Sequence, residues 1–146
     1  MPKHASVADA RQLQEQGGTY VDVRSQAEFE TGHPAGAVNV PLIDLDPDSG
    51  RMMPNPDFVR VMSANFAPES KLLIGCQVGG RSMRAAQMLE AFGFTDVTNV
   101  KGGFAGMRDP MGRLIDPGWA ESGLPVETGT ASGQRYADLA EKAGVD

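Results

Sequence analysis

The chain has 146 residues, of which 40% are hydrophobic and 22% are charged, and its net charge is −6. This size and balance predict a single globular domain with a substantial hydrophobic core. The acidic balance disfavours general binding to nucleic acids or anionic membranes, and no apolar run approaches the roughly 18 residues of a membrane span.

The amino terminus and the cysteine count bear on the cellular compartment. The first residues lack a basic region followed by an apolar stretch, so we expect no secretory signal. Cys76 is the only cysteine, which excludes an intramolecular disulfide and a cysteine-based zinc cluster within one chain. We therefore expect a reducing compartment, and the cytoplasm fits best.

Apolar spacing, β-branched runs and turn residues predict helices that alternate with short strands. In chain order the predicted elements are a helix opened by Ser6 and ended by Gly17, a strand over 20–23, a helical turn opened by Ser25, a turn over 32–36, a strand over 37–40, a helix capped by Asp57, a strand over 72–74, a helix with the apolar face Met83, Ala86, Leu89 and Phe92, a strand over 97–100, and an edge strand over 124–126. This alternation predicts an α/β fold with a mostly parallel sheet and helices on both faces. Ligands bind such sheets at the carboxyl ends of the strands.

Three stretches carry weaker signals. Residues 42–56 are rich in Asp, Pro, Gly, Asn and Met and predict a long loop that can wall a site. Residues 106–127 predict irregular segments packed on the domain, apart from the edge strand. The tail, residues 128–146, has helical spacing and is expected to form a helix that docks on the body.

The segment after the strand at 72–74 concentrates the reactive groups. Cys76 is followed by Gly79 and Gly80, which let the backbone turn with its N–H groups inward. Ser82 is placed to cap the next helix, and Arg81 adds a positive charge. These donors, the helix dipole and the guanidinium stabilise a thiolate relative to a thiol. The alternative is a buried cysteine that only packs, but such a residue would not need this loop.

Several linked motifs cover most of residues 5–127. They are Asp22-Val23-Arg24 with Glu28-Phe29, Gly32-His33 through Pro41, Cys76 through Ser82, Gly93-Phe94, Asn99 through Gly103, and Gly123 through Val126. In this order and spacing they resemble the rhodanese family of sulfurtransferases in its single-domain form. Several motifs at matching separations are far more specific than any one of them.

The resemblance implies a fold and a chemistry. The fold is a three-layer α/β sandwich around a mostly parallel five-stranded sheet, with a rhodanese domain over 5–127 and the tail outside it. The loop cysteine is implied to carry a persulfide sulfur, without a metal or an organic cofactor. The sequence departs from the family at Gly75, where a larger residue is frequent, and we expect this glycine to widen the pocket floor.

The implied reaction sets requirements that the loop can meet. Sulfur transfer is a covalent double displacement, in which a thiolate takes a sulfane sulfur and passes it to a second nucleophile. We expect Cys76 to be the catalytic residue, within a cradle of backbone N–H groups that stabilises the anionic sulfur. The predicted substrate-binding residues are Gln77, Val78, Gly79, Gly80, Arg81 and Ser82. Arg81 either binds the anionic end of the donor or pairs with a neighbouring carboxylate.

Three function classes remain open at this stage. The first is a sulfurtransferase that moves sulfur from thiosulfate or a similar small anion to cyanide, a thiol or a protein acceptor, without nucleic-acid or membrane partners. The second is a phosphatase or arsenate reductase of a related branch, whose loop has one residue more between cysteine and arginine than the four present here. The third is a non-catalytic interaction module, which would not need a polarised thiol.

Other polar residues are expected to be structural. His33 lies in a turn between glycine and proline, and His4 lies at a terminus expected to be mobile, so a cysteine–histidine pair is not supported. Asp22, Arg24 and Glu28 are expected to form one local set of ion pairs that ties a strand to a helix.

Overall fold

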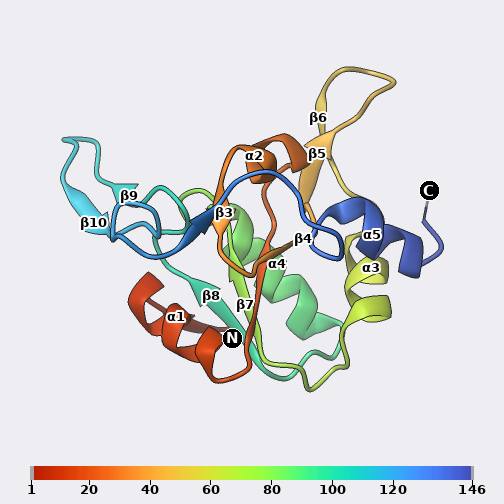
Figure 1. Ribbon diagram of the computed structural model, residues 1–146, viewed down its shortest axis with the longest axis horizontal. Helices are drawn as coiled ribbons and strands as arrows, with labels where there is room; N and C mark the ends of the chain where they lie inside the picture. Colours follow the sequence, from red (N-terminus) through yellow and green to blue (C-terminus); the bar gives the residue numbers. More distant parts are fainter. Residues whose placement is uncertain (1, 146) are drawn as a thin grey trace.

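A computed structural model, which describes residues 2–145, contains a central sheet of five strands (Figure 1). The strands lie in the order β1 (Lys3–Ala5), β8 (Val97–Val100), β7 (Leu72–Gly75), β2 (Thr19–Asp22) and β4 (Val38–Asn39). Every neighbouring pair in this sheet is parallel. The predicted α/β class with a parallel five-stranded sheet is therefore confirmed.

Helices cover both faces of the sheet. The described helices are α1 (Val7–Glu15), α2 (Gln26–Thr31), α3 (Phe58–Asn65), α4 (Gly80–Ala91) and α5 (Tyr136–Lys142). Leu72 and Ile74 of β7 pack with α3, α4 and α5, whereas Leu73 between them packs with α1 and Trp119. Successive side chains of a strand point to opposite faces, so this alternation produces two cores and three layers. None of the described helices is long and apolar enough to cross a membrane.

The first strand and the segment predicted as a loop required correction. Strand β1 was not expected, because Lys3–Ala5 has a single apolar residue, yet it pairs with β8 at the edge of the sheet. Within residues 42–56, β5 (Ile43–Leu45) and β6 (Met52–Pro54) form an antiparallel hairpin instead of an irregular loop. Figure 1 shows the turn of this hairpin extending away from the body.

The later irregular region also contains strands. β9 (Met107–Arg108) and β10 (Leu114–Asp116) form a second antiparallel hairpin that extends from the opposite side of the molecule (Figure 1). The predicted edge strand at 124–126 is β11 (Val126–Glu127), and its partner is β3 (His33–Pro34) in the predicted turn. This pair is a separate ribbon and not an edge of the central sheet.

The tail beyond residue 127 contains α5, which packs beside α3 (Figure 1). Leu139 is 4% exposed in the core that α3 and α4 share. Asn65 donates its side-chain amide to the Leu139 carbonyl at 2.9 Å. The Gln134 carbonyl accepts the backbone N–H of Asn39 at 2.8 Å, so the tail also covers the outer edge of β4. The tail is thus anchored to both a helix and the sheet.

Helix boundaries differ from the prediction in two places. Helix α4 begins at Gly80, about one turn earlier than its apolar spacing indicates, and Phe92 beyond its last turn is 67% exposed instead of buried. At α3 the Asp57 side chain makes no capping bond, and its backbone N–H donates to the Asn55 side chain instead. The predicted caps Ser6 and Ser25 do accept N–H groups of their own helices.

Candidate active site

Cys76 lies directly after β7, the central strand, at the carboxyl edge of the parallel sheet. Its side chain is 2% exposed. The Gly79 N–H donates to Cys76 Sγ at 3.1 Å, and the thiol donates to Ser82 Oγ at 3.4 Å. Gly79 has a φ of +128°, a conformation that side chains rarely adopt, and this turn brings its N–H to the sulfur. The loop therefore supplies at least one backbone donor where negative charge on sulfur would develop.

Ser82 lies beneath the sulfur and is not the helix cap that the sequence predicted. The cap position belongs to Gly79, because α4 starts before Ser82 and encloses it in the first turn. The fully buried Ser82 hydroxyl donates to Asn99 Oδ1 at 2.6 Å. Asn99 on β8 thus fixes the hydroxyl that touches Cys76.

The segment after β8 clamps the cysteine loop through backbone contacts. Phe104 N–H donates to the Cys76 carbonyl at 2.8 Å, and Ala105 N–H donates to the Gln77 carbonyl at 2.9 Å. Gly103 makes the close approach possible, since a Cβ there would lie 2.2 Å from the Cys76 carbonyl oxygen. The paired glycines of the resembling motif therefore have a steric role next to the loop.

Arg81 is held by a carboxylate at the flank of the loop. Its guanidinium makes two contacts with Glu28, at 2.8 and 3.1 Å. The hydrogen bond from Arg81 is the main cause that lowers the pKa of Glu28 from 4.5 to about 2, and Glu28 in turn raises the pKa of Arg81. Of the two roles left open for Arg81, the structure displays the ion pair. Binding of an anionic donor by Arg81 stays a prediction.

The expected set of Asp22, Arg24 and Glu28 is divided in two. Asp22 and Arg24 form a buried ion pair at 2.8 Å, while Glu28 belongs to Arg81 and to the cap of α2. Arg24 also donates to the Gln77 side chain at 3.1 Å. The buried pair therefore supports the cysteine loop from the β2 side, and the side chain of Gln77 is used for this support.

The pocket floor is not widened at Gly75, contrary to the expectation. An ideal Cβ at Gly75 would lie 1.9 Å from the Tyr20 hydroxyl oxygen, so the tyrosine fills the space that a side chain would occupy. Tyr20 is completely buried, and its pKa lies well above the usual value, chiefly because burial disfavours the charged form. A neutral phenol thus fills the space beside Gly75, the residue before Cys76.

The two histidines differ in their relation to the loop. His33 is buried, stacks on Phe29 with ring centroids 3.7 Å apart, and contacts the Phe29 carbonyl through Nδ1 at 2.7 Å, consistent with a structural role. His4 belongs to β1 and not to an unstructured end, and its Nδ1 lies 3.4 Å from Asn99 Nδ2. His4 is therefore connected to Cys76 through Asn99 and Ser82, although it does not touch the sulfur.

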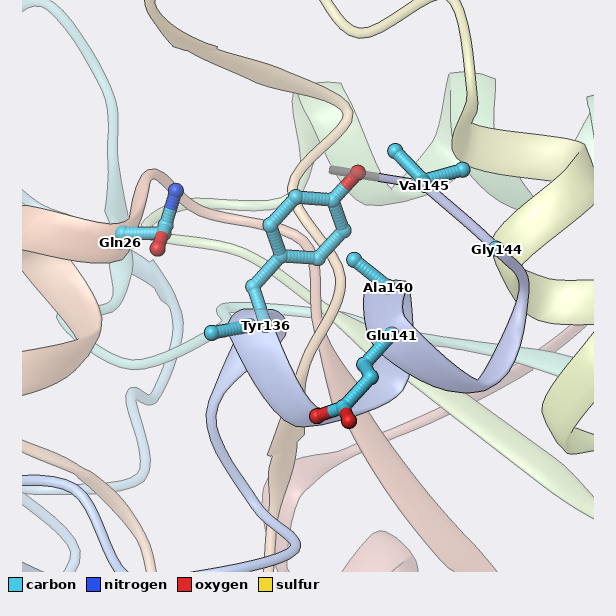
Figure 2. Close-up of a pocket in the computed structure, with 7 residues that line it drawn as sticks. Gln26, Tyr136, Ala140, Glu141, Gly144 and Val145 are labelled. Carbon is cyan, nitrogen blue, oxygen red and sulfur yellow. The ribbon is translucent and has the colours of Figure 1, made fainter.

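Two cavities differ in their distance from this chemistry. One of about 480 Å³ lies along the tail, where Figure 2 shows the Tyr136 ring with Gln26 on one side and Val145 on the other; none of its lining residues belongs to the cysteine loop. A second cavity, of about 360 Å³, is bordered by Val78, Gly79 and Gly80 of the loop. The second cavity is therefore the candidate substrate site.

Sequence reasoning missed Tyr20, Asn99 and His4. Asn99 reaches the sulfur through Ser82, His4 contacts Asn99, and Tyr20 lies against Gly75, the residue before Cys76. Tyr20 and Asn99 lie at inward positions of predicted strands, and a polar side chain there is a signal that a buried partner exists. His4 carried no such signal, because its strand was not predicted. Of the predicted loop residues, Val78, Gly79 and Gly80 line the cavity and Ser82 contacts the sulfur. The side chains of Gln77 and Arg81 are instead hydrogen-bonded to Arg24 and Glu28.

Known proteins resemble this chain in sequence. The family model of the rhodanese-like domain matches residues 6–109. The chain is 36% identical to thiosulfate sulfurtransferase 16, a chloroplastic protein of Arabidopsis thaliana, over 87% of this chain and 94% of that protein. It is 38% identical to the senescence-associated protein DIN1 of Raphanus sativus, over 87% of this chain but 62% of that protein.

A solved structure agrees with these relatives. The crystal structure of Rv0390 from M. tuberculosis superposes with a TM-score of 0.70 and 26% identity, over 87% of this chain and 98% of that one. The family match covers well over half of the residues and includes Cys76 with its loop. The chain belongs to the rhodanese-like domain family.

Proposed function

We propose that this protein is a sulfurtransferase in which Cys76 carries the transferred sulfur. The Cys76 thiolate attacks the outer sulfur of thiosulfate or a similar donor, the S–S bond of the donor breaks, and sulfite leaves with the bonding electrons. A thiophilic acceptor, such as cyanide, a thiol or a protein cysteine, then removes the sulfur and returns the thiolate. Neither step requires a metal or an organic cofactor.

One observation carries the proposal: the Gly79 N–H donates directly to Cys76 Sγ at 3.1 Å inside a loop that begins α4. This donor and the positive end of the helix stabilise a thiolate, which is the nucleophile the reaction needs. Relatives named thiosulfate sulfurtransferase support the same reaction. A non-catalytic interaction module would have no use for a buried thiol that receives an N–H bond.

Phosphate or arsenate chemistry is less well supported. Four residues separate Cys76 from Arg81, which makes a smaller ring of donors than the related phosphatase branch has. Arg81 is also engaged by Glu28 at 2.8 Å.

The partners and the compartment follow as proposals from this chemistry. A small anionic donor suits the N–H cradle, and no group of the proposed mechanism calls for nucleic acid or a membrane. A free thiol persists in a reducing compartment, so we propose the cytoplasm as the site of action.

The reaction is tested by turnover with thiosulfate as donor and cyanide as acceptor. The Cys76→Ser variant is expected to fold like the parent and to lose more than about a thousandfold in kcat, because a hydroxyl cannot hold a persulfide. An aryl phosphate is assayed in parallel. Retention of substantial sulfur transfer by Cys76→Ser, or comparable turnover of the aryl phosphate, would overturn the proposal.

A further inference from the structure

The cavity beside the cysteine loop has walls that adjoin the reactive sulfur. Gly79 lines this cavity, and its N–H lies 3.1 Å from Cys76 Sγ. Asn99, on another wall, is linked to the sulfur through Ser82 by contacts of 2.6 and 3.4 Å. A molecule that occupies the cavity is therefore held next to the loop that carries the sulfur. The volume, about 360 Å³, suits a small organic molecule.

The cavity contains charges of both signs. Lys101 and Asp116 both line it, and among the described residues neither takes part in an ion pair, with each other or with a third group. Lys101 is exposed and Asp116 is half-buried. Two opposite charges that face one cavity without pairing are available to a ligand that carries both charges itself.

His4 adds a hydrogen-bond donor to the lining of the same cavity. Ser82 donates to Asn99 Oδ1 at 2.6 Å, which leaves Asn99 Nδ2 as the donor towards His4 Nδ1, 3.4 Å away. When Nδ1 accepts in this way, the neutral ring carries its proton on Nε2. The hydrogen-bond network thus assigns His4 as a donor through Nε2 at the wall of the cavity.

Apolar side chains form another part of the cavity lining. Val78, Met83 and Met107 line the cavity, and Val78 and Met107 are 43% and 39% exposed. Methionine side chains adapt to the shape of a small aliphatic group. The cavity therefore combines a short apolar region with a cation, a donor and an anion.

We propose that this cavity binds the sulfur acceptor, and that the acceptor is a small zwitterionic thiol, an α-amino acid with a thiol side chain. Its carboxylate is recognised by Lys101 and His4, and its ammonium group by Asp116. The assignment rests on the proposed sulfur transfer by Cys76. In the step itself the acceptor sulfur bonds to the outer persulfide sulfur, the bond to Cys76 Sγ breaks, and the electron pair returns to Cys76. The thiol proton ends on the transferred sulfur, so the products are the acceptor persulfide and the Cys76 thiolate.

Four small thiols that differ in charge test the roles of Lys101 and Asp116 separately. Protein loaded with persulfide from thiosulfate is mixed with cysteine, 3-mercaptopropionate, cysteamine or 2-mercaptoethanol, and the second-order rate of sulfur loss is measured. For each thiol the rate of a variant is divided by that of the parent, so the intrinsic reactivity of the thiol cancels. The thiol 2-mercaptoethanol has neither charge and gives the reference for any general effect of a substitution.

Each substitution has its own expected pattern. Lys101→Gln lowers the ratio about fivefold for cysteine and 3-mercaptopropionate relative to the reference, because these two carry the carboxylate. Asp116→Asn lowers it about fivefold for cysteine and cysteamine, because these two carry the ammonium group. His4→Gln follows the pattern of Lys101→Gln. Lys142→Gln and Asp48→Asn, at exposed positions outside the cavity, serve as charge-matched controls.

The outcomes distinguish this assignment from the proposed function. In one outcome the persulfide forms, and the Lys101 and Asp116 variants change the rates with all four thiols alike or change none of these rates. In that case the acceptor assignment is wrong while sulfur transfer stands. If the control variants give the same patterns, the effect comes from net charge and the assignment is also wrong. If no persulfide forms, the proposed function and the acceptor assignment fail together.

Discussion

At the scale of single residues, the surroundings of Cys76 are set by side chains that come from neighbouring strands. Tyr20 on β2 occupies the space beside Gly75, and Asn99 on β8 orients the Ser82 hydroxyl. Burial raises the pKa of Tyr20, with further contributions from Asp22 and Cys76, so the phenol stays neutral. A neutral Tyr20 adds no negative charge near the thiolate that the reaction needs.

Gly75→Ala tests the packing of Tyr20. The added methyl group would lie 1.9 Å from the Tyr20 hydroxyl oxygen, so we expect the free energy of unfolding to fall by about 1–3 kcal/mol in urea titrations. Gly80→Ala is the matched control, because a Cβ there meets nothing within 4 Å, and it is expected to change stability by less than about 0.5 kcal/mol. Equal losses in the two variants would contradict this account of the packing of Tyr20 against Gly75.

The pair of Glu28 and Arg81 predicts a pH dependence of stability. The pKa of Glu28 is lowered from 4.5 to about 2 in the folded protein, so the carboxylate is favoured by folding. This contribution is fully present above pH 4.5 and is lost as the pH falls from there through about 2. The pair is partly exposed, and its contribution is accordingly modest.

Glu28→Gln measures this contribution, because glutamine preserves the capping box with Ser25 and removes the charge. We expect the variant to be less stable than the parent at pH 7, with a difference in unfolding free energy that shrinks between pH 5 and pH 2. Urea unfolding at a series of pH values gives the difference directly. A difference that does not change over this range would show that the ion pair is not its cause.

At the scale of elements, the sequence predicted the central strands and the position of Cys76 but not the junction that follows. The apolar run at Leu72 and the helical spacing after Met83 are local signals. The start of α4 depends on the positive φ of Gly79, and the role of Ser82 depends on Asn99, which is distant in sequence. The hairpins were missed because their two- and three-residue strands are largely exposed and show no alternation.

The tail helix gives a test at this scale. Removal of residues 130–146 deletes Leu139 from the core shared with α3 and α4, and we expect a loss of about 2–5 kcal/mol in unfolding free energy. The cysteine loop makes its own contacts with β8 and the segment after it, so sulfur transfer per folded molecule is expected to persist. A truncated protein that remains folded but transfers no sulfur would show that the tail contributes to the site.

At the scale of the whole molecule, the parallel sheet explains why the reactive loop lies where it does. Strands β8, β7 and β2 end at the same edge, and Cys76 directly follows β7. Asn99 from β8 orients the Ser82 hydroxyl that contacts the sulfur, and Asp22 from β2 pairs with Arg24, which donates to Gln77 of the loop. Alternation of strands and helices sufficed to predict this arrangement. The edge strand β1 could not be predicted, because its stability comes from pairing with β8 and not from its own residues.

The central claim is that Cys76 carries the transferred sulfur, and intact-mass spectrometry tests it most directly. The protein is exposed to thiosulfate and freed of excess reagent, and its intact mass is measured before and after addition of cyanide. We predict a gain of one sulfur atom located on Cys76, its removal by cyanide, and no gain in Cys76→Ser. A parent protein whose mass does not change, or an equal gain in the serine variant, would contradict the account.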